Sequence, residues 1–218
     1  MSSAREEILR RVRAALEPAA PPGRVPRAYR RAGEHRPGSP ALLDLLAERL
    51  VDYRATVHRT SADDLVPTIH RVLADLVSGG ARVSGGGVPG GARVVVPPGL
   101  PEGWAPPDAV LDGGLSTNEL DEAGAVLTAC AAAAAETGTL VLDGSAGQGR
   151  RAVSLVPDRH VCVVRADQVV QNIPELLGRL DPHRPLTFIS GPSATSDIEL
   201  HRVEGVHGPR TLVVVLVS

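Results

Sequence analysis

Three short polar segments carry the side chains that could do chemistry in this chain. The first holds Glu136, which is followed by Thr137-Gly138-Thr139 and stands between two apolar runs. A carboxylate at the end of a strand in an open α/β sheet lies near the crevice where ligands bind. Glu136 could then act as a general base or as a nucleophile, and we predict that Thr137, Gly138 and Thr139 bind the substrate. The alternative is a structural carboxylate that accepts N–H groups of its turn or pairs with an arginine.

The second segment, 190–195, follows the apolar residues Leu186 to Ile189. Its glycine and small hydroxyl side chains leave room for backbone N–H groups to approach an anionic group. We therefore predict a substrate-binding loop with four contributing residues, Ser190, Gly191, Ser193 and Thr195.

Two more candidates follow that loop. Asp197 is the best remaining acid, because Ser196 with Glu199 matches a capping box that would simply start a helical turn. His207 lies in a second polar turn, which favours an accessible imidazole that could move a proton, although a structural turn histidine remains open. A divalent metal bound by Asp197, Glu199, His201 and His207 is the weaker alternative, since ligand spacing is poor evidence, and we predict no metal.

The third segment is Gly147-Gln148-Gly149-Arg150-Arg151, a turn with two cations. Its guanidinium groups could clamp a carboxylate or phosphate, or could be solvated on a surface hairpin. Successive residues of a strand point to opposite sides, so Arg150 and Arg151 could have different roles. We predict that Glu136, the Ser190–Asp197 loop and the Gly205–Pro209 turn share one cleft at the carboxyl ends of strands, with Arg150 or Arg151 at its rim.

The order of elements favours an α/β protein. Ser3 to Leu16 is predicted to be a helix with a Ser3–Glu6 capping box and one apolar stripe. Residues 17–40 are rich in Pro, Arg and Gly and indicate an extended arm, which leaves the helix on a tether. We assign 1–40 to this helix and arm, through which oligomerisation is possible, and 41–218 to an α/β domain. Helices are predicted at 42–51, from a start at Ser61 with Asp64 to an end at Gly79-Gly80, and at 172–180 with a cap formed by Asn172 and Glu175. Strands are predicted at 55–59, 81–84, 93–96, 109–111, 139–142, 161–164, 186–189 and 211–217.

This alternation indicates a mostly parallel sheet covered on both faces. We expect the two C-terminal strands, at Leu186 and Thr211, to close it.

Composition excludes several kinds of function. All 23 basic residues are arginine, so a Schiff-base lysine, a pyridoxal-phosphate lysine and a Walker phosphate loop are impossible. The net charge of −2 gives no footprint for nucleic acid or an anionic membrane. No apolar run approaches the ~20 residues of a membrane span, and the first residues lack a secretory core. We expect a cytoplasmic protein.

Cysteine usage limits the cofactors. The chain has two cysteines, Cys130 and Cys162, so it cannot hold a four-cysteine iron–sulfur cluster. Each is flanked by small or apolar residues and is expected to be buried and unpaired. We expect no cofactor on this chain.

The chain resembles the LUD-domain family, and specifically its lactate-utilisation protein C (LutC/YkgG) branch. The likeness rests on Ala135 to Leu142, with Glu-Thr-Gly-Thr, and on Phe188 to Glu199, with Ser-Gly-Pro-Ser-Ala-Thr-Ser-Asp. It implies the three-layer α/β/α fold of the NagB/RpiA/CoA transferase group, with its mostly parallel sheet. The alanine run 129–135 favours a helix by propensity. The family pattern implies extended structure there, which we prefer.

The resemblance also implies a role in L-lactate oxidation to pyruvate, together with partner subunits that carry iron–sulfur clusters. Our first hypothesis is an accessory or substrate-binding component that binds a small carboxylate ligand. The second is a stand-alone CoA transferase, isomerase or folate cyclo-ligase-like enzyme that uses Glu136, because related CoA transferases use a glutamate nucleophile. The third is a sensor of a small carboxylate. Whether the isolated chain is catalytic stays open.

Overall fold

The computed structural model describes residues 3–16, 23–78, 93–195, 203–204 and 208–218. These residues belong to two compact units, Met1–Arg30 and Arg31–Ser218. In the part of the chain so described, no helix is long and apolar enough to cross a membrane.

The first unit contains helix α1 (Ala4–Leu16). The Ser3 N–H donates to Glu6 Oε2 at 2.8 Å and the Glu6 N–H donates to Ser3 Oγ at 3.3 Å, so the predicted capping box is confirmed. Within the described chain α1 buries none of its side chains. Its apolar stripe, Ile8, Leu9, Val12 and Leu16, is exposed.

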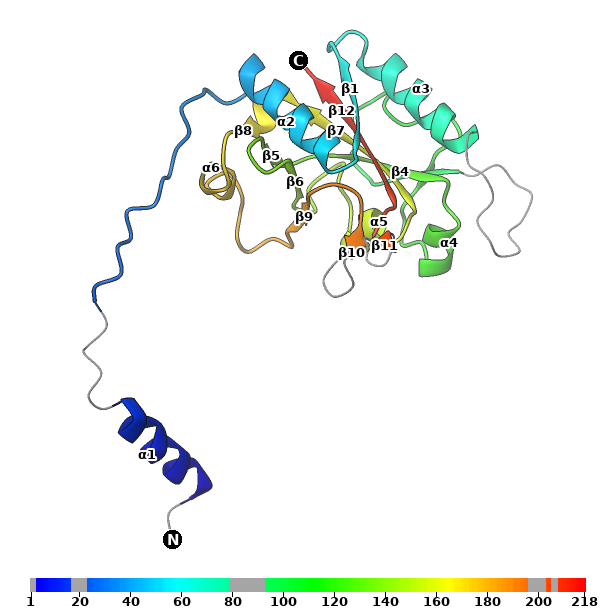
Figure 1. Ribbon diagram of the computed structural model, residues 1–218. Coiled ribbons are helices and arrows are strands. Elements are labelled where there is room, and N and C mark those ends of the chain that lie inside the picture. The colour runs from blue at the N-terminus through cyan, green and yellow to red at the C-terminus, as the bar shows by residue number, and fades with distance from the viewer. Residues whose placement is uncertain (1–2, 17–22, 79–92, 196–202, 205–207) are drawn as a thin grey trace. The chain divides into compact units, whose positions relative to one another are not determined.

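A six-stranded parallel sheet forms the centre of the second unit. Its strand order is β1-β12-β7-β4-β2-β3, and each neighbouring pair is parallel. β12 runs between β1 and β7 (red in Figure 1), so it lies inside the sheet. The strands are β1 (Thr56–Thr60), β2 (Val94–Val96), β3 (Val110–Leu111), β4 (Ala125–Ala129), β7 (Arg159–Arg165) and β12 (Thr211–Val217).

Helices cover both faces of this sheet. Helix α2 (Pro40–Asp52) packs its leucines on the face that carries Cys162 and Val214. Helix α3 (Leu65–Ser78) packs on the opposite face, against Val161 and Val213. The short helices α4 (Thr117–Asp121) and α5 (Arg151–Leu155) add a smaller cluster around Val95 and Val126. Residues i and i+2 of each central strand thus face one helix and the residues between them face another, as in a three-layer α/β/α protein.

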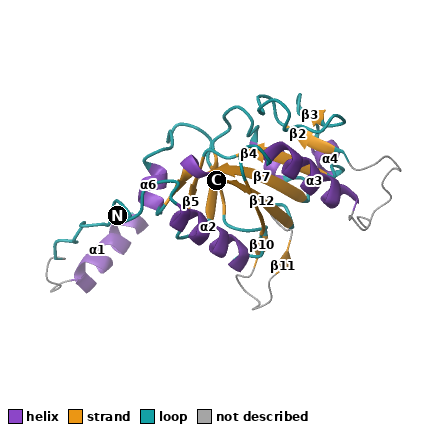
Figure 2. Ribbon diagram, turned by 90° about the horizontal axis from the view of Figure 1, so that it is seen from above, coloured by secondary structure: helices purple, strands orange, loops and turns teal. Residues whose placement is uncertain are grey.

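A second, four-stranded sheet has the order β8-β5-β6-β9. β5 (Ala132–Ala134) and β6 (Thr139–Leu142) form an antiparallel hairpin, β9 (Thr187–Ile189) pairs antiparallel with β6, and β8 (Val169–Val170) pairs parallel with β5. The 3₁₀ turn η1 (Ala166–Gln168) precedes β8. Helix α6 (Ile173–Leu177) packs on this sheet and lies beside β5 (Figure 2). β10 (Ala194–Thr195) and β11 (Val203–Glu204) form a separate two-stranded pair.

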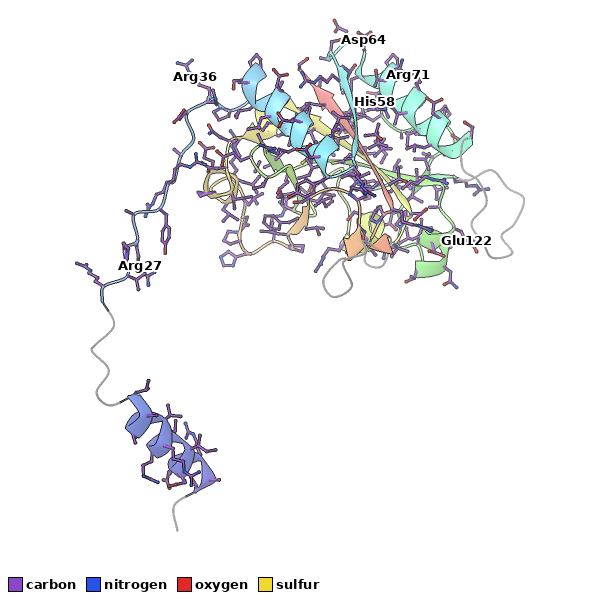
Figure 3. All side chains as sticks on the ribbon, viewed as in Figure 1. Arg27, Arg36, His58, Asp64, Arg71 and Glu122 are labelled. Atoms are coloured by element: carbon purple, nitrogen blue, oxygen red, sulfur yellow. The ribbon has the colours of Figure 1, made fainter. Side chains whose placement is uncertain are left out.

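Most predicted elements are confirmed. The alanine run is extended, as preferred, because its small side chains fit in β5 between β6 and β8, where Ala133 and Ala134 are fully buried. Both cysteines are buried, and neither forms a disulfide. Exposed polar side chains such as Asp64, Arg71 and Glu122 lie on the outside of the unit (Figure 3).

One expectation about the sheet is wrong. The C-terminal strands do not close one sheet: β9 belongs to the four-stranded sheet, and β12 fills an interior position of the other. The hydrophobic pattern marks both segments as buried strands, but it does not say which strands they pair with. The predicted strand at 81–84 and the Gly79-Gly80 helix end lie outside the described residues.

Candidate active site

A cavity of about 250 Å³ lies where the Ser190–Ser193 loop meets Gly208 and Pro209. The Ser193 N–H donates to the Pro209 carbonyl at 2.8 Å, which ties the loop to the second turn. The remaining wall comes from the strand and helix residues Ser154, Leu155, His160, Phe188, Ile189 and Leu212. Two of the three predicted turns therefore do share one cavity.

The cavity lies at the amino ends of β7 and β12, because His160 and Leu212 are the second residues of those strands. The expectation of a site at the carboxyl ends of the parallel strands is wrong for this cavity. The reason is topological. The Ser190 loop leaves the four-stranded sheet through β9 and reaches the larger sheet at its amino edge.

Glycine fixes the course of the Ser190 loop. Gly191 has φ +82°, and a Cβ at this position would lie 2.7 Å from Tyr53 Cβ and 2.8 Å from Tyr53 O. A side chain is therefore excluded both by the backbone conformation and by the close approach of the chain after α2. Gly138, in the Glu-Thr-Gly-Thr turn, has φ +57° and packs in the same way on Arg49. The end of α2 thus positions both motif blocks.

Hydroxyl groups connect these two blocks. Thr139 Oγ1 lies 2.7 Å from Thr137 Oγ1 and 2.9 Å from Ser190 Oγ. These three hydroxyl groups form a hydrogen-bonded chain from the hairpin turn between β5 and β6 to the first residue of the cavity loop. It holds the blocks in register, since each hydroxyl can donate one hydrogen bond and accept others.

Glu136 lies in the β5–β6 hairpin turn and is not among the described residues that line the cavity. Its Oε1 accepts a hydrogen bond from Gln171 Nε2 at 3.0 Å, and its N–H donates to the Gln171 carbonyl at 3.0 Å. Glu136 is half-buried, and its carboxylate and its backbone N–H each form a hydrogen bond with Gln171. This geometry favours a structural role for Glu136 over a role in the wall of the cavity.

Gln171 also holds the chain that leads to α2. Its Oε1 accepts the N–H groups of Glu34 at 2.7 Å and His35 at 3.0 Å, and Glu175 Oε1 accepts the N–H of Gly33 at 2.9 Å. Burial alone would raise the pKa of Glu175, but the N–H groups that it accepts outweigh burial and hold that pKa below its usual value. The 33–35 segment and Glu136 are thus joined through one amide side chain.

Arg150 and Arg151 have different surroundings, but strand alternation is not the reason, because Arg150 precedes helix α5 and Arg151 begins it. Arg150 makes a two-pronged ion pair with Asp112, with both N···O distances 2.9 Å. The Asp112 carboxylate is 4% exposed, and the hydrogen bonds from Arg150 hold its pKa below the usual value. Arg150 is therefore a structural residue that fixes the turn after β3, and its proposed ligand role is not supported by this geometry.

Arg151 begins α5 and is exposed. It lines a second cavity of about 280 Å³ with Arg150, Thr187 and Ser154, and Ser154 also lines the first cavity. Ser154 thus stands between the two spaces. Arg151 lines the second cavity and is not among the described residues that line the first, so its place at the rim of the first stays a prediction.

Sequence reasoning underestimated His160. The ring is 1% exposed and lines the cavity, its Nε2 is 2.7 Å from Thr128 Oγ1, and its Nδ1 is buried with no hydrogen-bond partner among the described residues. Burial lowers the pKa of His160 to about 4, so the ring is neutral at neutral pH. The signal available in the sequence was a polar residue, His160, directly before the apolar run that begins at Val161.

The adjacent thiols are also deeply buried. The neighbouring Cys130 thiol and burial together raise the pKa of Cys162 well above its usual value. Among the described residues, no group of three His, Cys, Asp or Glu side chains could hold a metal ion. Asp197 and His207, with Glu199 and His201, lie outside the described residues, and Thr195 is described only as part of β10.

The fold and these loops define a three-layer α/β protein with a small polar cavity, and comparison with known proteins narrows this class. The family model described as the LUD domain matches residues 43–217, and the chain belongs to this family. The resemblance inferred from the two motif blocks is thereby confirmed.

Individual relatives agree with this assignment. Lactate utilization protein C of Deinococcus radiodurans is 45% identical over 207 residues, which cover 92% of this chain and 87% of that protein. Uncharacterized protein YkgG of Escherichia coli is 33% identical over 91 residues, 38% of this chain and 39% of that protein. A crystal structure of a DUF162 family protein from Deinococcus radiodurans aligns with a TM-score of 0.64 at 38% identity, covering 82% of this chain and 97% of that one.

Proposed function

We propose that this protein takes part in lactate utilisation, as an accessory or substrate-binding component of an L-lactate-oxidising system. The observation that carries the proposal is the 45% identity, over 92% of the chain, to a protein named lactate utilization protein C. An identity of this extent across nearly a whole chain makes a common role the simplest expectation.

The chemistry of lactate oxidation determines what the partners must supply. Conversion of L-lactate to pyruvate releases two electrons and two protons, and the electrons need an acceptor. A chain with two cysteines cannot hold a four-cysteine cluster. We therefore assign iron–sulfur clusters to partner subunits, and to this chain the binding of a small carboxylate.

The cavity beside Ser190 is the site we assign to that carboxylate. Its volume of about 250 Å³ is below the roughly 300–1,000 Å³ of pockets for drug-sized ligands, which suits a short acid. Hydroxyl groups of the loop and Arg151 across the Ser154 wall are the donors that a carboxylate requires. We keep proton transfer by Glu136, Asp197 and His207 as part of the proposal, and Thr137, Gly138 and Thr139 as substrate-binding residues.

The stand-alone enzyme with a glutamate nucleophile receives less support. Glu136 Oε1 accepts from Gln171 Nε2, and Glu136 does not line the cavity described above. A nucleophile must reach the reacting carbon of its substrate.

Deletion of the gene tests the proposal directly. In a host without another lactate dehydrogenase, we expect loss of growth on L-lactate, normal growth on pyruvate, and rescue by the wild-type gene. Affinity purification of the tagged protein from lactate-grown cells should recover subunits that contain iron. Normal growth of the deletion strain on L-lactate would remove the proposed role, and growth loss without an iron-containing partner would remove only the assignment of the clusters.

A further inference from the structure

The second cavity, of about 280 Å³, lies beside the turn between β6 and α5. Its described lining contains two arginines, Arg150 and Arg151, and no carboxylate. The lining also contains the hydroxyl residues Ser154 and Thr187. A cavity whose charged side chains are all cationic favours an anionic ligand.

Two hydrogen-bond donors of this cavity are accessible and unused. The exposed Arg151 guanidinium has no hydrogen-bond or ion-pair partner among the described residues. The Thr187 hydroxyl also has no partner in the described part of the chain, and it is not one of the fully buried polar atoms there. An anion that enters the cavity can therefore reach both groups.

Arg150 has a different part in the cavity wall. Its Nε and Nη2 donate to Asp112, and Nη2 also donates to the Leu115 carbonyl, so these bonds hold the side chain in place. Within the described chain, Nη1 is left without a partner. Asp112 balances the charge of Arg150, and Arg151 supplies the net positive charge of the site.

The turn that carries the two arginines is fixed by its own hydrogen bonds. Gln148 Oε1 accepts the Asp143 N–H at 2.6 Å, and Gln148 Nε2 donates to Ser145 Oγ at 2.9 Å. The Gln148 side chain lies inside the turn, since the residue is 4% exposed. A wall that is ordered in advance loses little conformational freedom when a ligand binds.

The same turn lies against the carboxyl ends of three parallel strands. The Gly147 carbonyl accepts the N–H of Ala129, the last residue of β4, at 2.8 Å. A Cβ at Gly149 would lie 2.8 Å from the Cβ of Pro97, which follows β2, and Asp112 follows β3. Open α/β sheets bind their ligands beyond these ends. The second cavity therefore has the location in the sheet that the first cavity lacks.

The number of donors favours a phosphoryl group over a carboxylate. A carboxylate has two oxygens in one plane, which one guanidinium fork satisfies. The cavity offers donors from three side chains, Arg151, Thr187 and the Nη1 of Arg150, and a phosphoryl group has three oxygens that can accept from them. The volume leaves room beside a phosphoryl group for a short organic group, next to the apolar side chains of Leu142 and Pro185.

We propose that the second cavity binds the phosphoryl group of free phosphate or of a small phosphate ester, with Arg151 and Thr187 as its principal ligands. This site does not depend on the proposed role in lactate utilisation, because neither Arg151 nor Thr187 is among the described residues that line the first cavity.

Three substitutions change the site, and a fourth serves as the control. Arg151→Ala removes the charge, Arg151→Lys keeps the charge without the fork, and Thr187→Val keeps the shape of the side chain without its hydroxyl. The control is Arg71→Ala on α3 (Figure 3), because Arg71 is also exposed and without a partner among the described residues. Arg71 lies on the face of the sheet opposite to α5, and its loss changes the net charge equally.

Calorimetric titration of the full chain with inorganic phosphate and with methyl phosphate measures the affinities. We expect saturable binding to the wild type, a loss of about tenfold or more in Arg151→Ala, and a loss of about threefold or more in Thr187→Val. Arg151→Lys should lie between Arg151→Ala and the wild type. Arg71→Ala should stay within about twofold of the wild type, because distant exposed charges are screened. Tighter binding of methyl phosphate would identify an ester as the ligand, and tighter binding of phosphate would identify the free ion.

Nuclear magnetic resonance spectra locate the bound phosphate without any variant. Phosphate should move the amide resonances of Gly144, Gly149 and Thr187, which line the second cavity, and leave those of Ser193 and Gly208, which line the first, in place. These spectra decide the location of the site even if a variant fails to fold.

Several results would overturn the proposal. The wild type could bind neither phosphate, or phosphate could move only the resonances of the first cavity. Equal losses in Arg151→Ala and Arg71→Ala would reduce the effect to net charge. L-lactate and pyruvate, the short acids assigned to the first cavity, are the carboxylate probes. If they move the resonances of Gly144, Gly149 and Thr187 at the same concentrations as phosphate does, the assignment to a phosphoryl group is wrong.

Discussion

Glu136, in the β5–β6 turn, and His160, in the cavity wall, differ in how far their polar atoms are satisfied by hydrogen bonds. Glu136 stands in a conspicuous motif, yet its carboxylate is engaged by Gln171, which is itself held by the N–H groups of Glu34 and His35. His160 stands in an ordinary strand, yet its Nδ1 has no partner among the described residues. The motif residue is integrated into the fold, while the strand residue keeps a buried nitrogen without a partner among the described residues.

The difference shows that a conspicuous motif can mark where the chain must pack as well as where it acts. Gly138 and Gly191 are needed because Arg49 and Tyr53 approach them closely. Both glycines would be required even if no ligand bound. A buried hydrogen-bonding atom without a partner calls for its own explanation, because most such groups in folded proteins are satisfied.

Acid titration offers the largest test of this comparison. The native pKa of His160, about 4, lies below the ordinary value of 6.5, so between these pH values the unfolded chain binds a proton that the native chain does not. The contribution to stability is complete above pH 6.5 and is lost as pH falls toward 4, by roughly 2–3 kcal/mol. Urea unfolding at pH 7 and pH 4.5 should show the wild type losing that much more stability than His160→Gln. Parallel losses would mean that His160 is accessible to protons in the native state.

A pair of glycine substitutions tests the loop between the two regions. Gly191→Ala should destabilise the protein by about 2 kcal/mol, because it combines a positive φ with a clash against Tyr53. Gly208→Ala should change the unfolding free energy by less than about 0.5 kcal/mol and still weaken binding of L-lactate. Denaturant unfolding and calorimetry measure the two effects. Equal stability of both variants would contradict the constraint that we assign to Tyr53.

Substitution of Arg150 and of Arg151 separates an effect on stability from an effect on ligand binding. Arg150→Ala leaves the buried Asp112 carboxylate without its ion pair and should cost about 1–2 kcal/mol. Arg151→Ala removes an exposed side chain and should change stability by less than about 0.5 kcal/mol, while it weakens binding of the acids. A thermal and calorimetric comparison of the two variants suffices. Weaker binding in Arg150→Ala alone would reverse our assignment.

Glu136→Gln should have a small effect on stability. The new amide can still accept the hydrogen bond from Gln171 Nε2, so we expect a change below about 1 kcal/mol. Growth on L-lactate of a strain that carries this variant then reports whether the proton of Glu136 is used. We expect slower growth with normal protein levels. Unimpaired growth would leave Glu136 a purely structural carboxylate.

Local signals in the sequence predicted most helices and strands correctly. The Ser3–Glu6 pair and the Asn172–Glu175 pair each cap a helix as expected, because capping depends on residues three apart. The predicted helix from Asn172 is shorter than expected, since α6 ends at Leu177. Helix α5, with five residues, was missed because so short a segment has too few apolar positions to show a period.

Long-range pairing limited the prediction of the site. The contact between His160 and Thr128 depends on the register of β4 against β7, where Val126 is opposite His160 and Thr128 is opposite Cys162. Nothing local to either strand fixes that register. The hairpin that removed Glu136 from the cavity wall depends likewise on the pairing of Ala134 with Thr139.

The interior place of β12 also determines when the protein can fold. β1 pairs only with β12 in the described sheet, so its edge cannot be satisfied until Thr211–Val217 has been synthesised. Until β12 has been synthesised, the edges of β1 and β7 that pair with it have no partner strand. These edges can then pair with other chains. We therefore expect nascent chains that stop before residue 211 to require a chaperone, and β1 to join the sheet only after β12 has left the ribosome.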